Sequence, residues 1–591
     1  MRSFIPGLLC AWVAVVDGVA VPPSARSLTK RQGQDVFSLP QYAVNGTARA
    51  ADIEVKREGW IYGPSIAGNT SYYPNGTLGN AATAADHKAA FDFQNEHLSG
   101  GVKTLDDFSK YYDGQWKLTA PDGPYKGMLT NYTDDLLFSM ERLSVAPFRL
   151  FRVQADDSLP FAVDNAAKVS GLSLSDLQSQ GRLFLVDHSD QKDLPRSSTY
   201  KYGGAAQAYF YIHPDSDDFL PLAIKPNNEG SDLVFTPEDD ANDWLLAKMI
   251  FNLNDVWYTQ WFHLAATHEV AEIVYLSAIR SLSEEHPFMP ILHRLSKWTW
   301  AMRPLAIERL VYSGGPVDQL FPWAGSIAQD YTDGLYQSGE ASAWQANYFS
   351  TNLAARGLIN SKFGPALKSF PFHDDASTVL GAIRTFFAGV VDAYYEDDDA
   401  VSADVELQAW LVEASGPAAV RDFPAALSDD GDKKAQVVDI LTHFAYLVAV
   451  QHGVLNTNSP VASTASLPLH PLAFYQPLPT ARGTIASADD LVAYLPPAAA
   501  AVGQIALLAS FNRPEFLGTD QTLRHMFDFD TDVRARLSDG AGKAADAFAD
   551  AMGDFADVVG ARGFDADGLS QGMPFVWTAL DPDIASYWIT I

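Results

Sequence analysis

Two short motifs place metal-binding side chains in stretches that are otherwise apolar, His263-Leu-Ala-Ala-Thr-His268 and His452-Gly-Val-Leu-Asn456. With the carboxylate of the last residue, Ile591, they can offer three imidazoles, one amide oxygen and one carboxylate. Nitrogen and oxygen donors without thiolate suit iron or manganese in the divalent or trivalent state. The first chemistry that the residues suggest is therefore that of a non-haem metal site.

The spacing of each pair makes a structural prediction. Residues five apart lie about 140° apart around a regular α-helix, so His263 and His268 would not reach one ion. A π-bulge adds one residue to a turn and brings such a pair into line, so we predict a π-bulge between Phe262 and His268. His452 and Asn456 are four apart and share one face of an ordinary helix. Each pair taken alone is also compatible with core histidines bonded to nearby carbonyl groups.

The elements that must position these residues are mainly helices. The segment from Thr47 to Gln180 has a mixed pattern with Gly-, Pro- and Asn-rich loops, so helices are expected chiefly after Asp240. Three β-prone runs predict a small antiparallel sheet: Arg182 to Val186, Ala208 to Ile212 and Leu220 to Ile224. Helical periodicity or all-apolar faces predict seven helices: Trp244 to Phe251, Trp257 to Leu282, Met289 to Leu310, Ala376 to Tyr395, Val437 to Val454, Ala498 to Phe511 and Ala541 to Val559. The fold class expected is mainly α, with no linker that divides the chain.

The N-terminus predicts export. An apolar stretch after Arg2 and small residues at Gly18 and Ala20 are typical of a signal peptide over residues 1–20. The dibasic pair Lys30-Arg31 would end a pro-segment over residues 21–31, so residues 32–591 would form the mature enzyme. The single cysteine, Cys10, lies within the signal, and the mature protein would therefore have no disulfide, cysteine ligand or cysteine nucleophile.

Composition narrows the choice of partners. The net charge of -31 would repel nucleic acids and anionic membrane surfaces. We expect no stable membrane insertion, because no uninterrupted apolar stretch long enough to cross a bilayer follows the signal peptide. Four Asn-x-Ser/Thr acceptors predict a glycosylated N-terminal face: Asn45, Asn69, Asn75 and Asn131. We expect a soluble, extracellular protein, which is a monomer in our interpretation.

Residues around both motifs resemble the lipoxygenase family over roughly Arg182 to the end of the chain. Its metal shell includes the terminal carboxylate of an aliphatic residue, as Ile591 would provide. The matching segments are Pro221-Leu-Ala-Ile224, Val234-Phe-Thr-Pro237, Trp244-Leu-Leu-Ala-Lys248, Asn254-Asp255, Trp261-Phe262-His263, Thr267-His268, Glu272, Leu282-Ser283, His286-Pro287 and Ala449-Val-Gln-His-Gly-Val-Leu-Asn456.

Departures from the plant and animal pattern resemble the secreted fungal branch. Too little chain precedes the match for the β-barrel lipid-binding domain of plant and animal members. Leu295 stands where they have a further histidine, and the end, Tyr587-Trp-Ile-Thr-Ile591, lacks their Asn-Ser signature. Many fungal members use manganese, so the resemblance implies one manganese ion, with iron as the alternative, and no organic cofactor.

The resemblance also implies the reaction. His263, His268, His452, Asn456 and Ile591 would bind the ion, and a metal-bound hydroxide would be the base, without a separate side-chain base. The metal-bound hydroxide would take a hydrogen from the bis-allylic carbon of a polyunsaturated fatty acid, linoleic or α-linolenic acid. Dioxygen would then add to give a hydroperoxide. The helix of the first histidines, the Met302 to Leu310 stretch and the Ala498 to Phe511 helix are expected to wall an apolar pocket.

Two further residues follow from the family pattern. Ala306 matches the small residue that directs oxygen, where alanine commonly gives S products, although it could equally be an alanine at a tight helix crossing. Arg513 would bind the fatty-acid carboxylate at the pocket mouth, with Arg524 as the second choice; either could equally be a solvated arginine.

Two other classes of protein remain open at this point. One is a different non-haem metal oxygenase, but its carboxylate ligand would come from a side chain near the first histidine, and Glu269 points elsewhere on a helix. The other is a secreted lipid carrier that keeps the fold without catalysis. Such a carrier would hold no stoichiometric metal and form no conjugated diene.

Overall fold

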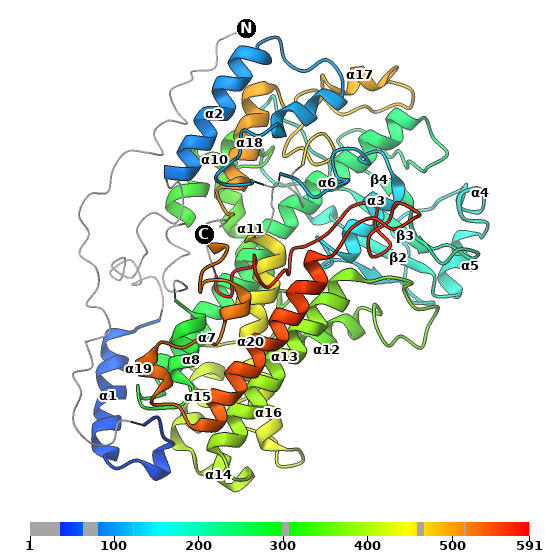
Figure 1. Cartoon of the computed structure of the whole chain (residues 1–591). Helices are drawn as coiled ribbons and strands as arrows, with labels where there is room; N and C mark the ends of the chain where they lie inside the picture. The colour runs from blue at the N-terminus through cyan, green and yellow to red at the C-terminus, as the bar shows by residue number, and fades with distance from the viewer. Residues whose placement is uncertain are drawn as a thin grey trace.

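A computed structural model describes residues 36–62, 81–121, 123–297, 299, 306–457, 466–512 and 516–589. Helices dominate this part of the chain, with one small sheet at an edge of the body (Figure 1). The first two helices, α1 (Gly46–Gly59) and α2 (Ala81–His97), lie at opposite ends of the molecule. The mainly α fold class is therefore confirmed.

The sheet has four antiparallel strands in the order β1-β2-β3-β4. They are β1 (Phe151–Arg152), β2 (Leu183–Asp187), β3 (Gln207–Ile212) and β4 (Phe219–Lys225). The three predicted strands are confirmed, while β1 is too short to show periodicity. One face packs on the main core through Phe210, and the other lies over α4 (Ala166–Ser170) and α5 (Leu174–Ser179) through Tyr209.

Helix α6 (Ala241–His263) is buried along almost its whole length and ends at the first candidate ligand. It joins the two helical stretches predicted on either side of residue 254. The other helices not yet named are α3 (Asp135–Met140), α7 (Val270–Ile279), α8 (Met289–Leu295), α10 (Pro316–Leu320), α11 (Gly325–Ser338), α12 (Phe349–Ala355), α13 (Pro371–Tyr394), α14 (Asp398–Ala403), α15 (Val405–Ser415), α16 (Lys433–Ala445), α17 (Ala488–Leu491), α18 (Ala498–Ala509), α19 (Thr531–Arg534) and α20 (Asp539–Gly560).

Two sequence-based expectations about helices are wrong. The helix predicted from Met289 to Leu310 ends at Leu295, and a separate π-helical segment, η8 (Ile307–Val311), follows. The region predicted to be mostly loop contains α1 and α2. Helix α1 has no strong apolar face, and polar contacts hold it in place instead. Arg49 pairs with Glu406, and Lys56 donates to the carbonyl of Leu282.

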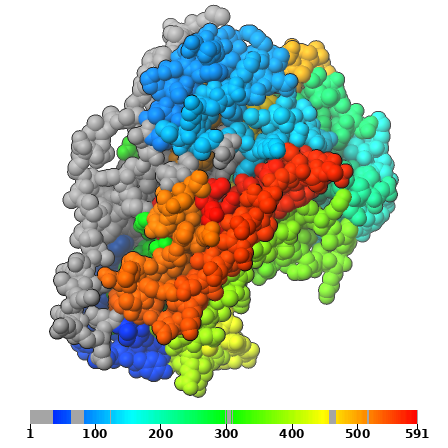
Figure 2. All heavy atoms as spheres, in the orientation of Figure 1, coloured from blue at the N-terminus to red at the C-terminus, as the bar shows by residue number. Residues whose placement is uncertain are grey.

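Helices α13 and α20 pack side by side and support the helix that carries the second motif (Figure 1). Small residues allow the close approach, since a Cβ on Gly389 would lie 2.8 Å from Ala544, and one on Gly540 would lie 2.8 Å from Ala393. The outer side of α20 forms a long ridge on the molecular surface (Figure 2). Helix α16 packs on α13, so the second motif rests on a rigid helical layer.

Two helical stretches, Pro371–Tyr394 and Lys433–Leu455, are long and apolar enough to cross a bilayer. Core helices of soluble proteins pass the same test, and 89% of the apolar window in Lys433–Leu455 is buried. Neither stretch is uninterrupted, because Arg384 lies in the first and Asp439 in the second, and the absence of membrane insertion stays a prediction.

A buried ionic network ties α3, α6 and the chain after the second motif together. Arg142 donates to Glu141 at 2.7 Å and to Asp255 at 3.0 Å, and Glu141 in turn lies 2.8 Å from Nε2 of His470. Burial alone would raise the pKa of Asp255, but the Arg142 guanidinium together with His188 and His470 holds that pKa below its usual range. The rings of Phe138 and Phe251 lie 4.5 and 4.7 Å from the guanidinium, so Arg142 is enclosed on every side.

Replacement of Arg142 by methionine is expected to lower the free energy of unfolding by about 3–5 kcal/mol, because Asp255 and Glu141 would lose the guanidinium that balances their buried charges and would keep only their contacts with histidines. Chemical denaturation measures this change. The matched control is Arg384→Met, which removes an exposed ion pair with Asp439 and should cost less than about 1 kcal/mol. Equal losses in the two variants would contradict the role given to Arg142.

A second stability prediction concerns acid. His443 on α16 is buried among Trp344, Tyr348 and Tyr446, and burial lowers its pKa to about 3. Below pH 6.5 the unfolded chain binds a proton that the folded protein excludes, so folding is destabilised as the pH falls from about 6.5 toward 3. His443→Leu should therefore reduce the loss of unfolding free energy between pH 7.5 and pH 5 by about 2 kcal/mol. The same loss in both proteins would contradict this prediction.

Candidate metal centre

The helix that carries the first motif widens where its histidines lie. Helix α6 ends at His263, a π-helical segment η7 (Leu264–Glu269) follows, and α7 continues from Val270. The predicted π-bulge is therefore confirmed. The Thr267 hydroxyl donates to the carbonyl of His263 at 2.7 Å and so provides a partner for a backbone group within the widened turn.

The helix of the second motif is also widened. Helix α16 passes into a π segment, η9 (Tyr446–Gln451), then through His452 into another, η10 (Gly453–Thr457). The expectation of an ordinary helix here is wrong, because four-residue spacing fits one face of either helix type and does not distinguish them. Asn456 lies in η10, but its side chain is outside the described part of the chain, as is Ile591.

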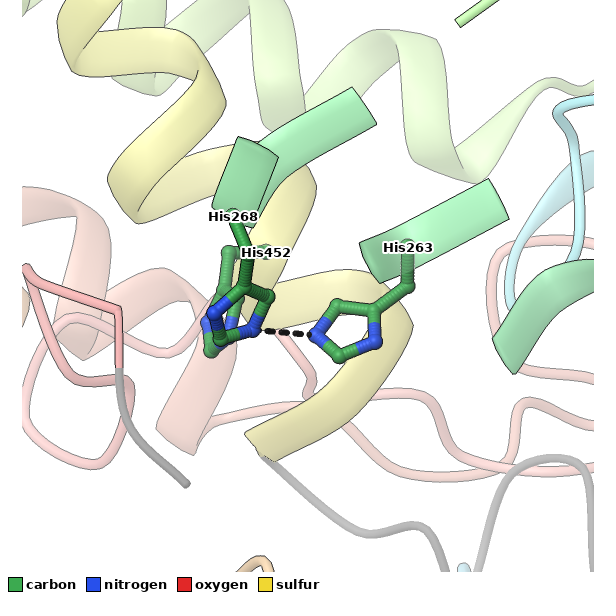
Figure 3. A group of neighbouring side chains, drawn as sticks. All are labelled: His263, His268 and His452. Carbon is green, nitrogen blue, oxygen red and sulfur yellow. Dashed lines mark hydrogen bonds between the residues drawn. The ribbon is translucent and has the colours of Figure 1, made fainter. Parts of the chain in front are cut away.

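The three histidines converge at their Nε2 atoms (Figure 3). Nε2 of His268 lies 2.9 Å from that of His263 and 3.2 Å from that of His452. Their rings are 4.6 to 5.0 Å apart at the centroids and steeply inclined to one another. They form a group of candidate ligands whose atoms all lie within 4.8 Å of one another.

Burial keeps the imidazoles of His263 and His268 neutral. It lowers the pKa of His263 to about 3, and burial with the neighbouring imidazoles holds that of His268 well below its usual value. Nδ1 of His263 donates to the carbonyl of Gln260 at 3.3 Å, which leaves a lone pair on Nε2. Neutral imidazoles whose lone pairs face one another are the form in which histidine binds a metal.

The donor set fits a transition-metal ion. Adjacent ligands at metal–nitrogen distances of about 2.1 Å in an octahedral shell are about 3 Å apart, as these Nε2 atoms are. Without a cation, two converging lone pairs repel, and hydrogen bonds could relieve the repulsion only where one ring carries its proton on Nε2. His263, His268 and His452 can therefore hold one ion, with nitrogen ligands that suit manganese or iron.

A narrow cavity of about 50 Å³ opens beside His263. Each of the three predicted walls contributes lining residues, such as Leu264, Ala306 and Leu507, so these walls are confirmed. Met302, at the start of the second wall, is outside the described residues. The lining is apolar except for His263 and two glutamines: Gln260, Trp261, His263, Leu264, Ala306, Ile307, Leu310, Val311, Val317, Phe321, Gln329, Leu507, Leu508 and Phe511.

A larger cavity of about 640 Å³ lies against the same two helices, where Phe262 precedes His263 and Gln451 precedes His452. Its polar wall includes Arg149, which pairs with Asp190. Sequence analysis missed this cavity, because residues from many separate segments form it and no motif marks any of them.

Two arginines and four asparagines are the remaining predicted site residues. Arg513 lies outside the described residues, and Arg524 forms an ion pair with Asp583 at 3.2 Å. Asn45 is exposed, and its side-chain oxygen caps α1 by accepting from the amide of Ala48. The side-chain nitrogen of Asn131 donates to the carbonyl of Pro574 at 2.7 Å. The other two acceptors, Asn69 and Asn75, are outside the described residues.

Three buried imidazoles that converge from two widened helices define a non-haem metal protein with an apolar cavity beside its centre. The profile of the lipoxygenase family matches residues 163–488. The manganese lipoxygenase of Nakataea oryzae is 44% identical over 594 residues, which cover 96% of this chain and 94% of that protein. This chain belongs to the lipoxygenase family.

Solved structures agree with this assignment. The manganese lipoxygenase of Gaeumannomyces graminis superposes with a TM-score of 0.88 at 42% identity, over 94% of this chain and all of that chain. A calcium-dependent 11R-lipoxygenase, at 22% identity and a TM-score of 0.73, shares the fold. It is matched over 83% of its length.

We expect His268→Ala to lose bound metal, because it removes the imidazole that lies between the other two. The measurement is metal per protein chain after purification. His443→Ala is the control, since His443 is also buried and neutral but lies outside the cluster. Full metal content in the His268 variant would exclude His268 as a ligand, and loss in both variants would indicate a general effect of helix damage.

Proposed function

We propose that this protein is a secreted, manganese-dependent lipoxygenase that converts polyunsaturated fatty acids, linoleic and α-linolenic acid, to hydroperoxides. The observation that carries the proposal is the convergence of three buried imidazoles beside a narrow apolar cavity. Manganese rather than iron is favoured by two relatives over 40% identical across nearly the whole chain, each a manganese lipoxygenase. Iron remains the alternative.

His263, His268 and His452 would hold the ion, and we propose Asn456 and the carboxylate of Ile591 as its oxygen ligands. When bound, the ion supplies the one-electron oxidant that removal of hydrogen from a bis-allylic carbon requires. Leu264, Leu507 and Phe511 would bind the hydrocarbon chain and exclude water beside the centre.

Substrate orientation is a further part of the proposal. We propose that Arg513 binds the fatty-acid carboxylate through a bidentate contact at the mouth of the cavity. Arg524 is the weaker choice, because Asp583 already neutralises its guanidinium. A buried carboxylate without such a cation would be costly, so one arginine is expected at the mouth.

The extracellular assignment rests on the sequence of the N-terminal 31 residues. We propose cleavage after Ala20 and again after Arg31, with secretion of residues 32–591 as one catalytic domain. Among the glycosylation acceptors, Asn45 is favoured over Asn131, because the side-chain nitrogen of Asn131 is engaged by Pro574. We also propose that the mature protein is a monomer without stable membrane insertion.

Elemental analysis and a spectrophotometric assay test the function together. The secreted protein is expected to contain about one manganese per chain and to form a conjugated diene from linoleate in the presence of oxygen. Removal of the metal should abolish diene formation. A protein with no stoichiometric manganese or iron and no diene product would be a lipid carrier. One iron per chain would change only the identity of the metal in the proposal.

Stereochemistry provides a separate prediction from Ala306, which is buried in the cavity wall. We expect mainly S hydroperoxide from the native enzyme and a larger R fraction from Ala306→Gly, because loss of the methyl group opens space for oxygen at another carbon. Chiral chromatography of the products measures the ratio. Val317→Ala, which also enlarges the cavity by removing carbon from its wall, is the matched control. An unchanged ratio of S to R product in Ala306→Gly would show that Ala306 contributes only to packing.

A further inference from the structure

The large cavity of about 640 Å³ has no part in the proposed function. Its volume is within the range of sites that bind small organic molecules. Exposed residues stand on its rim, among them Ser189, Glu340 and Ala355, so the cavity is open to water. None of the three clustered histidines lines it. An occupant of this cavity would therefore lie apart from the metal centre.

Aromatic rings form much of the inner wall. Phe372 is buried, and the centroid of its ring lies 5.4 Å from that of Phe148 and 5.8 Å from that of Phe349. The ring of Phe349 is in turn 5.5 Å from that of Tyr446. These are the separations of aromatic pairs in which a ring edge meets a ring face. A flat aromatic ligand can join such a cluster, and it loses less conformational freedom on binding than a flexible chain does.

One cation in the wall has no carboxylate partner among the described residues. Arg356 donates through Nε to Oδ1 of Asn352 at 2.9 Å. Its Nη1 donates to the carbonyls of Pro147 and Leu150 at 2.6 and 2.9 Å, while its Nη2 has no acceptor in the described part of the chain. Burial lowers the pKa of Arg356 to about 10, because the more distant charge of Glu340 offsets it only in part. The guanidinium is still charged at neutral pH.

The acidic side chains of the same wall already have partners. Arg149 donates to both carboxylate oxygens of Asp190 at 3.0 Å. Glu340 accepts from the hydroxyl of Tyr258 at 2.9 Å. Asp187 accepts from a backbone amide and from a side-chain amide, each at 2.8 Å. The unpaired guanidinium is thus the charged group of this wall that a ligand can still neutralise.

We propose that the large cavity is a second binding site, and that its ligand is an aromatic monocarboxylate. The carboxylate accepts from Nη2 of Arg356 and neutralises the guanidinium, while the aromatic ring packs among the phenylalanines of the inner wall. This site goes beyond the proposed function, in which the fatty acid occupies the narrow cavity. Because Phe262 and Gln451 line the large cavity, its occupant lies against both helices that carry the histidines.

Isothermal titration calorimetry of the intact metal-loaded protein tests the site with two matched probes, naphthoate and its amide, naphthamide. The probes share a ring system and differ in the charged carboxylate. The native protein is expected to bind naphthoate about tenfold more tightly than naphthamide, the difference expected for one charge-assisted hydrogen bond. In Arg356→Gln this difference should disappear. Decanoate, whose carboxylate is carried by a flexible chain, should bind the native protein more weakly than naphthoate does.

Arg356 also binds two backbone carbonyls, so a second variant guards against a structural explanation. Ala355→Trp keeps Arg356 and fills part of the cavity from an exposed position, and it should weaken the binding of both naphthalene probes equally. Arg421→Gln is the matched control, because Arg421 likewise donates to a backbone carbonyl, that of Gln337, but lies outside the cavity. This control should bind both probes as the native protein does.

The outcomes separate this inference from the proposed function. Equal affinity for naphthoate and naphthamide, or no binding of naphthoate by the native protein, overturns the inference even where the protein oxidises linoleate. Unchanged binding in Ala355→Trp places the ligand elsewhere and overturns the site. Decanoate bound as tightly as naphthoate overturns the aromatic preference. Naphthoate binding that requires Arg356 and the space beside Ala355 supports the inference, including in a protein that proves inactive toward linoleate.

Discussion

The structure around the centre depends on the convergence of three imidazole Nε2 atoms in a dry interior. Nε2 of His268 lies 2.9 and 3.2 Å from its two counterparts, and burial keeps His263 and His268 from acquiring charge. A cation among these atoms can be bound by all three nitrogens at once, which hydrogen bonds between the rings cannot achieve. The helices that carry the histidines must therefore be held firmly by the rest of the molecule, which the α13 and α20 layer does for one and the Arg142 network does for the other.

Much of the centre could be predicted from sequence because its spacing conflicts with a regular helix. His263 and His268 cannot share a face of an α-helix, so convergence requires a widened turn, and η7 provides it. The pair His452 and Asn456 carries no such conflict, and the π segments on that helix could not be foreseen. The strands β2, β3 and β4 could be predicted because apolar, β-branched and aromatic residues dominate them.

Other features depend on contacts between distant segments and leave no local pattern. Helix α1 is held by ion pairs with residues more than 200 positions away, such as Glu406, so periodicity gave no sign of it. The large cavity and the enclosure of Arg142 by two phenylalanines arise in the same way.

The π-helical segments of the described chain have a consequence for how the protein acquires its metal. Segment η7 contains His268 and follows His263, η9 and η10 lie on either side of His452, and a π turn is rare compared with an α turn. A ligand that binds only the widened form stabilises it in proportion to its affinity and concentration. Metal loading and the local order of these helices are thus thermodynamically linked, and amide hydrogen exchange over η7, η9 and η10 would report how fully the protein is metallated.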